Sequence, residues 1–299
     1  MARIVGCITT SHVPAIGRAI AKGLQEEPYW KPFFDRFAPV HRWLAQAKPD
    51  VAVIVYNDHG LNFFLDKMPT FAIGAAPEYV SADEGWNIPT VAPFKGDPAL
   101  SWHLINEVMA TDFDLTTCQE MVVDHAVCNP MALLWPGGGD WPVRIVPVEI
   151  NTVQYPLPSA ARCFKLGEAV GRAITSYPED LRVVVIGTGG LSHQLDGERA
   201  GFINKEFDRR FMSSLTEDPT WVTRYSTLEL VEQAGTQGIE LLLWLTARAT
   251  LGRVRELAAN YHIPISNTAA GMMLLEPASA LGAMLRTART SIGMRSSAT

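Results

Sequence analysis

The chain has 299 residues, of which 47% are hydrophobic, and its 25 basic and 31 acidic side chains give a formal net charge of −6. This composition is typical of a packed globular protein and not of a disordered one, and without a basic stripe it does not favour a nucleic-acid partner. We expect a cytoplasmic protein with no membrane span, because the four cysteines form no CxxC pair, no signal peptide opens the chain and no apolar run is long enough to cross a bilayer.

The first half of the chain alternates between strand and helix patterns. A strand is predicted over 3–9, then helices over 15–24 and 34–47, the second kinked by Pro39 or beginning at it. The continuous apolar run 51–56 predicts a strand that is covered on both faces, and 70–73 predicts another. Residues 76–98 contain four prolines and are expected to form a long loop, followed by a helix over 100–110.

The second half continues the same alternation. Strands are predicted over 144–148 and 181–186, a helix over 158–175, and largely helical structure over 204–249 with a break near Gly235–Gly238. A late strand pair is expected at 262–265 and 271–275. We therefore expect an α/β protein, a single domain over 1–290 with a central mixed sheet flanked by helices and an active site at the strand ends, and a flexible tail over 291–299.

Three of the strand-like runs end in a histidine, namely His12, His59 and His193. Strand ends of an α/β sheet are where ligands and metals are usually held. Three imidazoles at such edges therefore indicate a protein that binds a metal or moves protons.

The three histidines differ in how strongly they indicate a functional site. His12 follows a strand and precedes a helix, so its position taken alone favours a plain turn residue over a metal ligand. His59 closes the polar triplet Asn57-Asp58-His59 after a buried strand, where a turn alone needs no histidine. His193 follows a glycine-rich segment that lacks the spacing of a phosphate-binding or dinucleotide-binding loop, which favours an active-site role.

Two further residues have open interpretations. His125 ends a short strand pattern and either lines the same pocket, with its imidazole oriented by a carboxylate, or belongs to a surface turn. Glu240 opens a strongly apolar helix, where it either complements the helix N-terminus or turns inward to complete a metal site. Two histidines and one carboxylate are the ligand set of non-haem Fe(II) oxygenases, and His12, His59 and Glu240 are candidates for such a set.

Several motifs in this order resemble a known family, the class III (LigB-type) extradiol ring-cleaving dioxygenases, and within it the catalytic β subunit of protocatechuate 4,5-dioxygenase. The resemblance runs through nearly the whole chain. The motifs are Thr10-Ser11-His12-Val13-Pro14, Val55-Tyr56-Asn57-Asp58-His59, Ala82-Asp83-Glu84-Gly85-Trp86, Val123-Asp124-His125, Gly187-Thr188-Gly189-Gly190 with Ser192-His193-Gln194, and Ser266-Asn267-Thr268.

The resemblance implies a role for each of these residues. It implies Fe(II) ligands at His12, His59 and Glu240, an acid/base histidine at His193 and a second pocket histidine at His125. It also places the residues that hold the ring substituent at Ser266, Asn267 and Thr268, and we add Asn57 to the expected substrate contacts.

The resemblance also implies a reaction and partners. We expect Fe(II)-dependent extradiol cleavage of a carboxylated catechol by O2, with protocatechuate giving 4-carboxy-2-hydroxymuconate semialdehyde. Gallate and 3-O-methylgallate are alternative substrates, and a zinc-dependent hydrolase or a non-enzymatic relative is an alternative function. The family pairs this subunit with a small helical α subunit. Because no fused α domain follows Thr299, we expect a separate partner in an α2β2 assembly, or a homodimer with a more open site.

Overall fold

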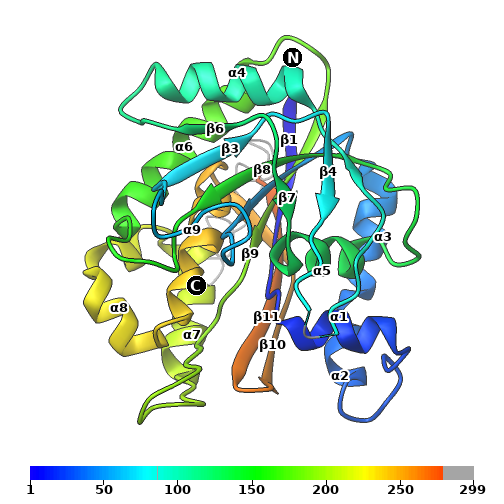
Figure 1. Cartoon of the computed structure of the whole chain (residues 1–299), viewed down its shortest axis with the longest axis vertical. Helices are drawn as coiled ribbons and strands as arrows, with labels where there is room; N and C mark the ends of the chain where they lie inside the picture. The colour runs from blue at the N-terminus through cyan, green and yellow to red at the C-terminus, as the bar shows by residue number, and fades with distance from the viewer. Residues whose placement is uncertain (86, 279–299) are drawn as a thin grey trace, which may run out of the picture.

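The computed structural model describes residues 1–85 and 87–278 (Figure 1). Its centre is a mixed sheet of eight strands, and three further strands form a small second sheet. In spatial order the main sheet contains β10 (Val254–Ile265), β11 (Thr268–Pro277), β1 (Arg3–Thr10), β9 (Arg182–Thr188), β2 (Val51–Tyr56), β8 (Arg144–Ile150), β3 (Phe71–Gly74) and β6 (Thr116–Cys118).

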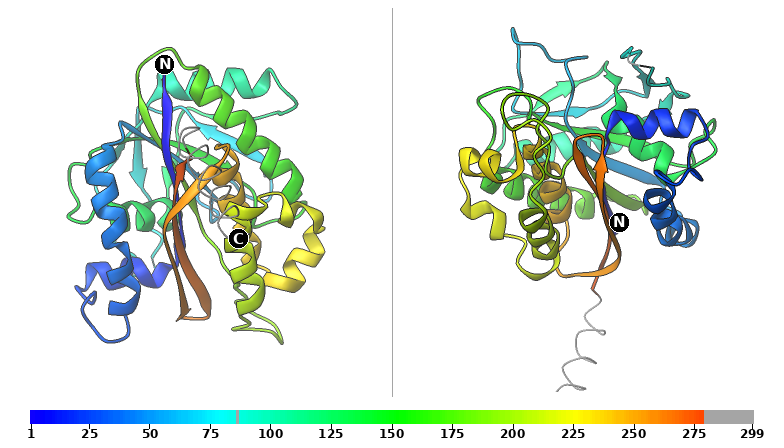
Figure 2. Two further views of the ribbon diagram at one scale, coloured as in Figure 1. Left: turned by 180° about the vertical axis from the view of Figure 1, so that it is seen from behind. Right: turned by 90° about the horizontal axis from the view of Figure 1, so that it is seen from below.

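Helices cover both faces of this sheet (Figure 2). One face carries α4 (Pro98–Met109), α6 (Ala160–Ser176), α7 (Lys205–Glu217), η2 (Trp221–Arg224), α8 (Thr227–Ala234), η3 (Gly238–Glu240) and α9 (Leu241–Ala249). The other face carries α1 (Pro14–Ala21), α2 (Lys31–Phe34), η1 (Asp35–Phe37), α3 (Ala38–Ala47) and α5 (His125–Leu134). The α/β fold expected from the sequence is therefore confirmed.

Strand β2 shows why the sequence folds into these layers. All six of its side chains are buried, and they alternate between the two cores: Val53 and Val55 pack on the α6 and α9 side, whereas Ile54 and Tyr56 pack on the α1 and α5 side. Adjacent side chains of a strand point to opposite faces, so a strand buried on both sides has no polar position. The apolar run in the sequence is a consequence of this double burial.

Four neighbouring strands of the sheet run in the same direction. Strand β9 is parallel to both β1 and β2, and β2 is parallel to β8. The carboxyl ends of β1, β9, β2 and β8 therefore meet at one edge of the sheet, which is where ligands bind in such sheets. Close packing of α9 on β9 supports this edge, because a Cβ on Gly187 would lie 2.8 Å from the carbonyl oxygen of Leu243.

Several predicted elements need correction. Residues 76–98 are not a plain loop, since β4 (Glu78–Ser81) and β5 (Phe94–Lys95) pair within them and join β7 (Val122–Val123) in the second sheet. Helix α5 was missed because nine of its ten residues are buried and Pro130 lies inside it, which leaves no amphipathic stripe to recognise. The late strand pair is a much longer hairpin, β10 and β11, than the short apolar segments suggested.

Other predictions agree with the structure or lie beyond it. Helix α3 begins next to Pro39, in agreement with the interpretation that a helix starts at this proline. The predicted break in the later helical region lies between α8 and α9. The flexible tail predicted over 291–299 lies outside the described residues, and the domain limit at residue 290 stays a prediction. Within the described residues, no helix has the length and apolar character needed to cross a membrane.

Candidate metal centre and active site

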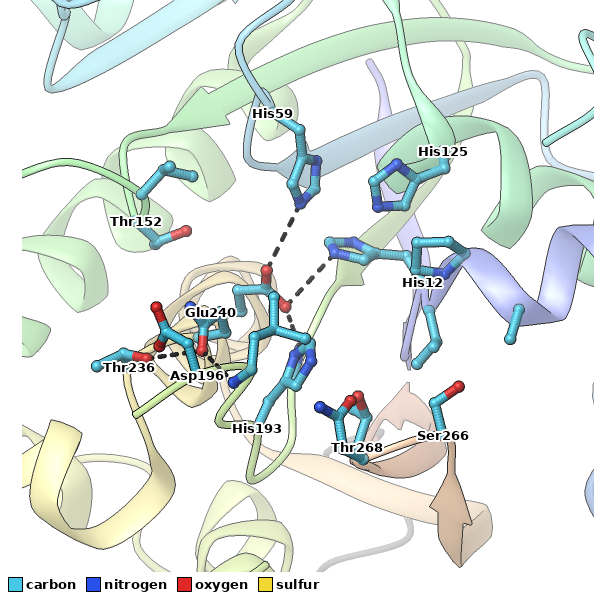
Figure 3. Close-up of a pocket in the computed structure, with 18 of the residues that line it drawn as sticks. His12, His59, His125, Thr152, His193, Asp196, Thr236, Glu240, Ser266 and Thr268 are labelled. Atoms are coloured by element: carbon cyan, nitrogen blue, oxygen red, sulfur yellow. Dashed lines mark hydrogen bonds and ion pairs between the residues drawn. The ribbon is translucent and has the colours of Figure 1, made fainter. Parts of the chain in front are cut away.

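Three segments far apart in the chain meet at the carboxyl edge of the sheet. His12 lies between β1 and α1, His59 follows β2, and Glu240 ends η3 immediately before α9. Figure 3 shows the Glu240 carboxylate between the two imidazoles. Its Oε2 lies 3.4 Å from His12 Nε2 and its Oε1 lies 3.7 Å from His59 Nε2.

The far side of each imidazole is held by the protein. His59 Nδ1 lies 3.0 Å from Asp124 Oδ2, which also accepts the His59 backbone N–H at 2.9 Å. His12 Nδ1 lies 3.2 Å from the Thr188 hydroxyl. A carboxylate at Nδ1 makes that nitrogen the donor and leaves the lone pair on Nε2, which is the arrangement usual for histidine metal ligands.

Glu240 is buried, with 7% of its surface exposed, and yet it is strongly ionised. Burial by itself raises the pKa of a carboxyl, but the charges and hydrogen bonds of His12 and His59 together outweigh it and hold the pKa of Glu240 well below its usual value. The Gly190 N–H donates to Glu240 Oε2 at 3.0 Å. Gly189 has a positive φ of 85°, and a Cβ there would lie 2.8 Å from the Glu240 Cβ, so glycine is required for this approach. The inward interpretation of Glu240 therefore agrees with the structure.

These donors fit a divalent metal ion. Two nitrogen or oxygen ligands that each lie about 2.0–2.2 Å from one ion are themselves about 3–3.5 Å apart, and the gaps between Glu240 and the two imidazoles are close to this spacing. His12, His59 and His125 also bring one ring nitrogen each within 4.8 Å of one another. Two imidazoles and a carboxylate suit iron or zinc better than magnesium or calcium, which prefer oxygen ligands alone.

His125 is part of the same cluster, but its carboxylate partner is not its sequence neighbour. The centre of its ring lies 4.2 Å from that of His59. Glu84 lies 2.6 Å from His125 Nδ1 and accepts the His125 backbone N–H at 2.7 Å, while Asp124 holds His59 instead. Burial and the nearby charge of His59 lower the pKa of His125, although Glu84 opposes this shift. Sequence reasoning assigned no role to Glu84, whose only signal was its place in the motif at residues 82–86.

His193 reaches the centre from the loop after β9. Its backbone N–H donates to the Ala234 carbonyl at 2.7 Å, and the neighbouring Ser192 donates its N–H and its hydroxyl to Asp208 Oδ1. Burial lowers the pKa of His193, and the Glu240 carboxylate only partly offsets this effect. A histidine with a lowered pKa is neutral at pH 7 and is therefore able to accept a proton.

A cavity of about 620 Å³ opens onto this cluster. Its lining brings together eight of the nine site residues expected from the sequence: His12, His59, His125, His193, Glu240, Ser266, Asn267 and Thr268. Asn57 needs correction, because it is fully buried and does not line the cavity. Its side-chain nitrogen lies 3.3 Å from His59 Nε2, so the geometry gives it a contact with that imidazole.

Comparisons with known proteins place this geometry in context. The family model described as the catalytic LigB subunit of aromatic ring-opening dioxygenase matches residues 6–271. The chain is 42% identical to a gallate dioxygenase of Pseudomonas putida over 196 residues, which are 65% of this chain and 57% of that protein. It is 29% identical to a 2,3-dihydroxyphenylpropionate/2,3-dihydroxicinnamic acid 1,2-dioxygenase of Rhodococcus jostii, over 83% of this chain and 89% of that one.

The chain spans little more than half the length of the gallate dioxygenase it matches. Among solved structures, an uncharacterized protein of Escherichia coli K12, JW3007, covers 92% of this chain with a TM-score of 0.57 and 14% identity, which shows a shared fold alone.

Proposed function

Because this chain belongs to the family of catalytic LigB subunits of aromatic ring-opening dioxygenases, whose model matches residues 6–271, we propose that it is an extradiol ring-cleaving dioxygenase. The observation that carries the proposal is the Glu240 carboxylate facing the Nε2 atoms of His12 and His59 at the base of a large cavity. The names of the Pseudomonas putida and Rhodococcus jostii relatives, both dioxygenases, support the same activity.

The metal in this proposal is Fe(II), held by His12, His59 and Glu240. Two histidines and one carboxylate, with open positions opposite, are typical of non-haem Fe(II) oxygenases. The ion supplies one centre at which two adjacent ring oxygens and O2 are held close together. Asp124 and Thr188 orient the two imidazoles for this task from the opposite side of each ring.

The protein's own part in the chemistry falls mainly to His193. A catechol must lose a proton to bind through both oxygens, and a neutral His193 imidazole on the cavity wall is able to accept it. The same imidazole then returns the proton later in the reaction. His125, whose Nδ1 is held by Glu84, is a second imidazole on the cavity wall, and its Nε2 is able to accept a hydrogen bond from a ring hydroxyl.

The substrate class in this proposal is a carboxylated catechol. Arg18 is the only lysine or arginine among the described residues that line the cavity, and Ser266, Asn267 and Thr268 add polar groups to the lining. Protocatechuate, cleaved at the 4,5 bond to 4-carboxy-2-hydroxymuconate semialdehyde, is the substrate expected from the sequence. Gallate is the second candidate, and the name of the Pseudomonas putida relative favours it.

We also propose a partner at the cavity mouth. Three apolar lining residues are largely exposed there: Val153 (46%), Tyr155 (62%) and Leu195 (54%). Exposed apolar groups around a binding site are typical of a surface that another chain covers. A small α subunit or a second copy of this chain would complete the enclosure.

The test of the proposed function is O2 uptake by the chain after anaerobic loading with Fe(II). Protocatechuate and gallate are added separately, and the product spectrum is recorded. Uptake with a yellow semialdehyde-like product supports extradiol cleavage. A metal-loaded chain that takes up no O2 with any catechol, alone or with an added α subunit, would refute the proposal.

A further inference from the structure

Two buried hydroxyls on the cavity wall have no hydrogen-bond partner among the described residues. They belong to Thr152, which is 4% exposed, and Thr268, which is 2% exposed. A buried hydroxyl without a partner destabilises the folded state by roughly 1–3 kcal/mol, so each such group needs an explanation. Both residues line the cavity, so a ligand toward which either side chain turns is a group that can satisfy its hydroxyl.

Thr152 follows the carboxyl end of β8, the fourth strand end at the ligand-binding edge. Sequence reasoning passed over this strand end because no histidine marks it. Figure 3 shows Thr152 on the wall beside His59, with Thr268 on the other side of Glu240 next to Ser266. The two residues with unpaired hydroxyls therefore lie in different parts of the cavity lining.

The backbone that carries Thr152 is fixed in place. The side chain of the preceding Asn151 donates to the Gln154 carbonyl at 2.7 Å and accepts the backbone N–H groups of Val153 at 3.2 Å and Gln154 at 3.0 Å. These three bonds close the loop around Thr152. A hydroxyl held in this way loses little further freedom on binding, which is what a specificity contact needs.

Ring geometry separates the tasks of the two threonines. In a 3,4,5-trihydroxybenzoate, the two adjacent hydroxyls that bind a metal are those on C4 and on one of its ring neighbours. The third hydroxyl, on the other neighbour of C4, lies next to this pair and meta to the carboxylate. A residue that meets the third hydroxyl must therefore flank the metal centre, as Thr152 does beside His59. Thr268 lies in the segment expected at the carboxylate end.

We propose that Thr152 is a specificity-determining residue, whose hydroxyl bonds the ring hydroxyl that does not bind the metal. The preferred substrate class is then a carboxylated ring with three adjacent hydroxyls, such as gallate, over one with two, such as protocatechuate. This inference rests on the proposed function for its substrate class. The physical basis of this preference is that protocatechuate would leave the buried Thr152 hydroxyl without a hydrogen bond, which disfavours its binding relative to gallate.

The test is the ratio of kcat/KM for gallate to kcat/KM for protocatechuate in Thr152→Val. Valine keeps the shape and removes the hydroxyl, so we expect this ratio to fall by about tenfold or more, mainly through gallate. Thr152→Ser retains the hydroxyl and should keep most of the preference. Thr236→Val is the matched control, because the Thr236 hydroxyl lines the same cavity but already donates to Gln237 Oε1 at 2.6 Å.

Equilibrium binding separates this inference from the proposed function. Gallate and protocatechuate are titrated under argon into the wild type and Thr152→Val, each loaded with Zn²⁺ so that no turnover occurs. Tighter binding of gallate that disappears in Thr152→Val supports the inference even if no variant consumes O2. Equal binding of the two ligands by the wild type, or a preference that survives in Thr152→Val, would overturn it even if the enzyme is an active dioxygenase.

Discussion

At the scale of single residues, the site is organised by what holds the far side of each imidazole. Asp124 holds His59, Thr188 holds His12 and Glu84 holds His125, so all three rings are oriented from outside the cluster. Asp124 also raises the pKa of His59, to about 10, because its charge and that of Glu240 outweigh the effect of burial. A bound cation would displace that proton from His59.

Asp124→Asn is expected to weaken metal affinity by about 10–100-fold, since the amide no longer fixes the tautomer and charge of His59. Metal titration of the purified variant measures this change. Asp97→Asn is the matched control, because Asp97 is likewise a buried aspartate that caps a helix, α4, but it does not contact a site histidine. Equal affinities of the two variants would contradict the orienting role of Asp124.

His193→Ala is expected to retain its metal and to lose turnover by about 10²–10⁴-fold, because only the acid/base group is removed. Metal content and O2 uptake, measured on the same preparation, separate the two effects. His41→Ala serves as the control, since His41 lies on α3 away from the cavity, and it should keep its activity. Full turnover by His193→Ala would show that His193 is not the acid/base group.

At the scale of elements, the site depends on how loops at the sheet edge are tied to helices. Asp208 of α7 accepts hydrogen bonds from Ser192, beside His193, and from the Tyr261 hydroxyl of β10. One buried carboxyl therefore connects a helix, a strand and the loop that carries His193. Burial raises the pKa of Asp208 to about 6, although the hydrogen bonds from Ser192 and Tyr261 oppose the shift.

This shift predicts a pH dependence of stability. Because the folded-state pKa lies above the unfolded value, Asp208 favours the folded state fully below about pH 4, and this contribution is lost as pH rises through about 6. The neutral variant Asp208→Asn should therefore gain roughly 2–3 kcal/mol relative to the wild type between pH 4 and pH 8. Urea unfolding of both proteins at several pH values measures this difference. Parallel pH profiles would show that Asp208 does not titrate as described.

At the scale of the whole molecule, the metal centre draws on segments that are remote in sequence. His12, His59 and Glu240 come together only when β1, β2 and α9 have assembled. The unfolded chain has no preformed site, so the free energy of metal binding adds to the free energy of folding.

Metal at about 100 times its dissociation constant is therefore expected to stabilise the chain by about 2.7 kcal/mol and to raise its Tm by several degrees. Thermal unfolding with Fe(II) under argon, and then with a chelator, measures the effect and its reversal. Glu240→Ala should show no such shift at the same metal concentration. If Glu240→Ala remained fully loaded with metal and were stabilised as much as the wild type, Glu240 would not be a metal ligand.

The sequence by itself determined the layers of the fold and indicated most of the residues that gather at the candidate site. Burial on both faces makes a central strand such as β2 a continuous apolar run. The polar residues that follow this run, the last of which is His59, mark the carboxyl end of the strand. These are local signals, carried by neighbouring residues. The helix α5 shows where such signals fail, because a helix that is buried on nearly every side has no alternation of apolar and polar faces.

Only the tertiary structure decided which distant groups meet. Glu240 had two equal interpretations until the packing of α9 against Gly189 turned its carboxylate inward. Glu84, and not the adjacent Asp124, is the partner of His125. Thr152 lines the cavity, although no sequence motif indicated this position. The physical reason is that a hydrogen bond or a shared ligand joins atoms across long loops, whereas sequence patterns report only the burial and periodicity of each segment.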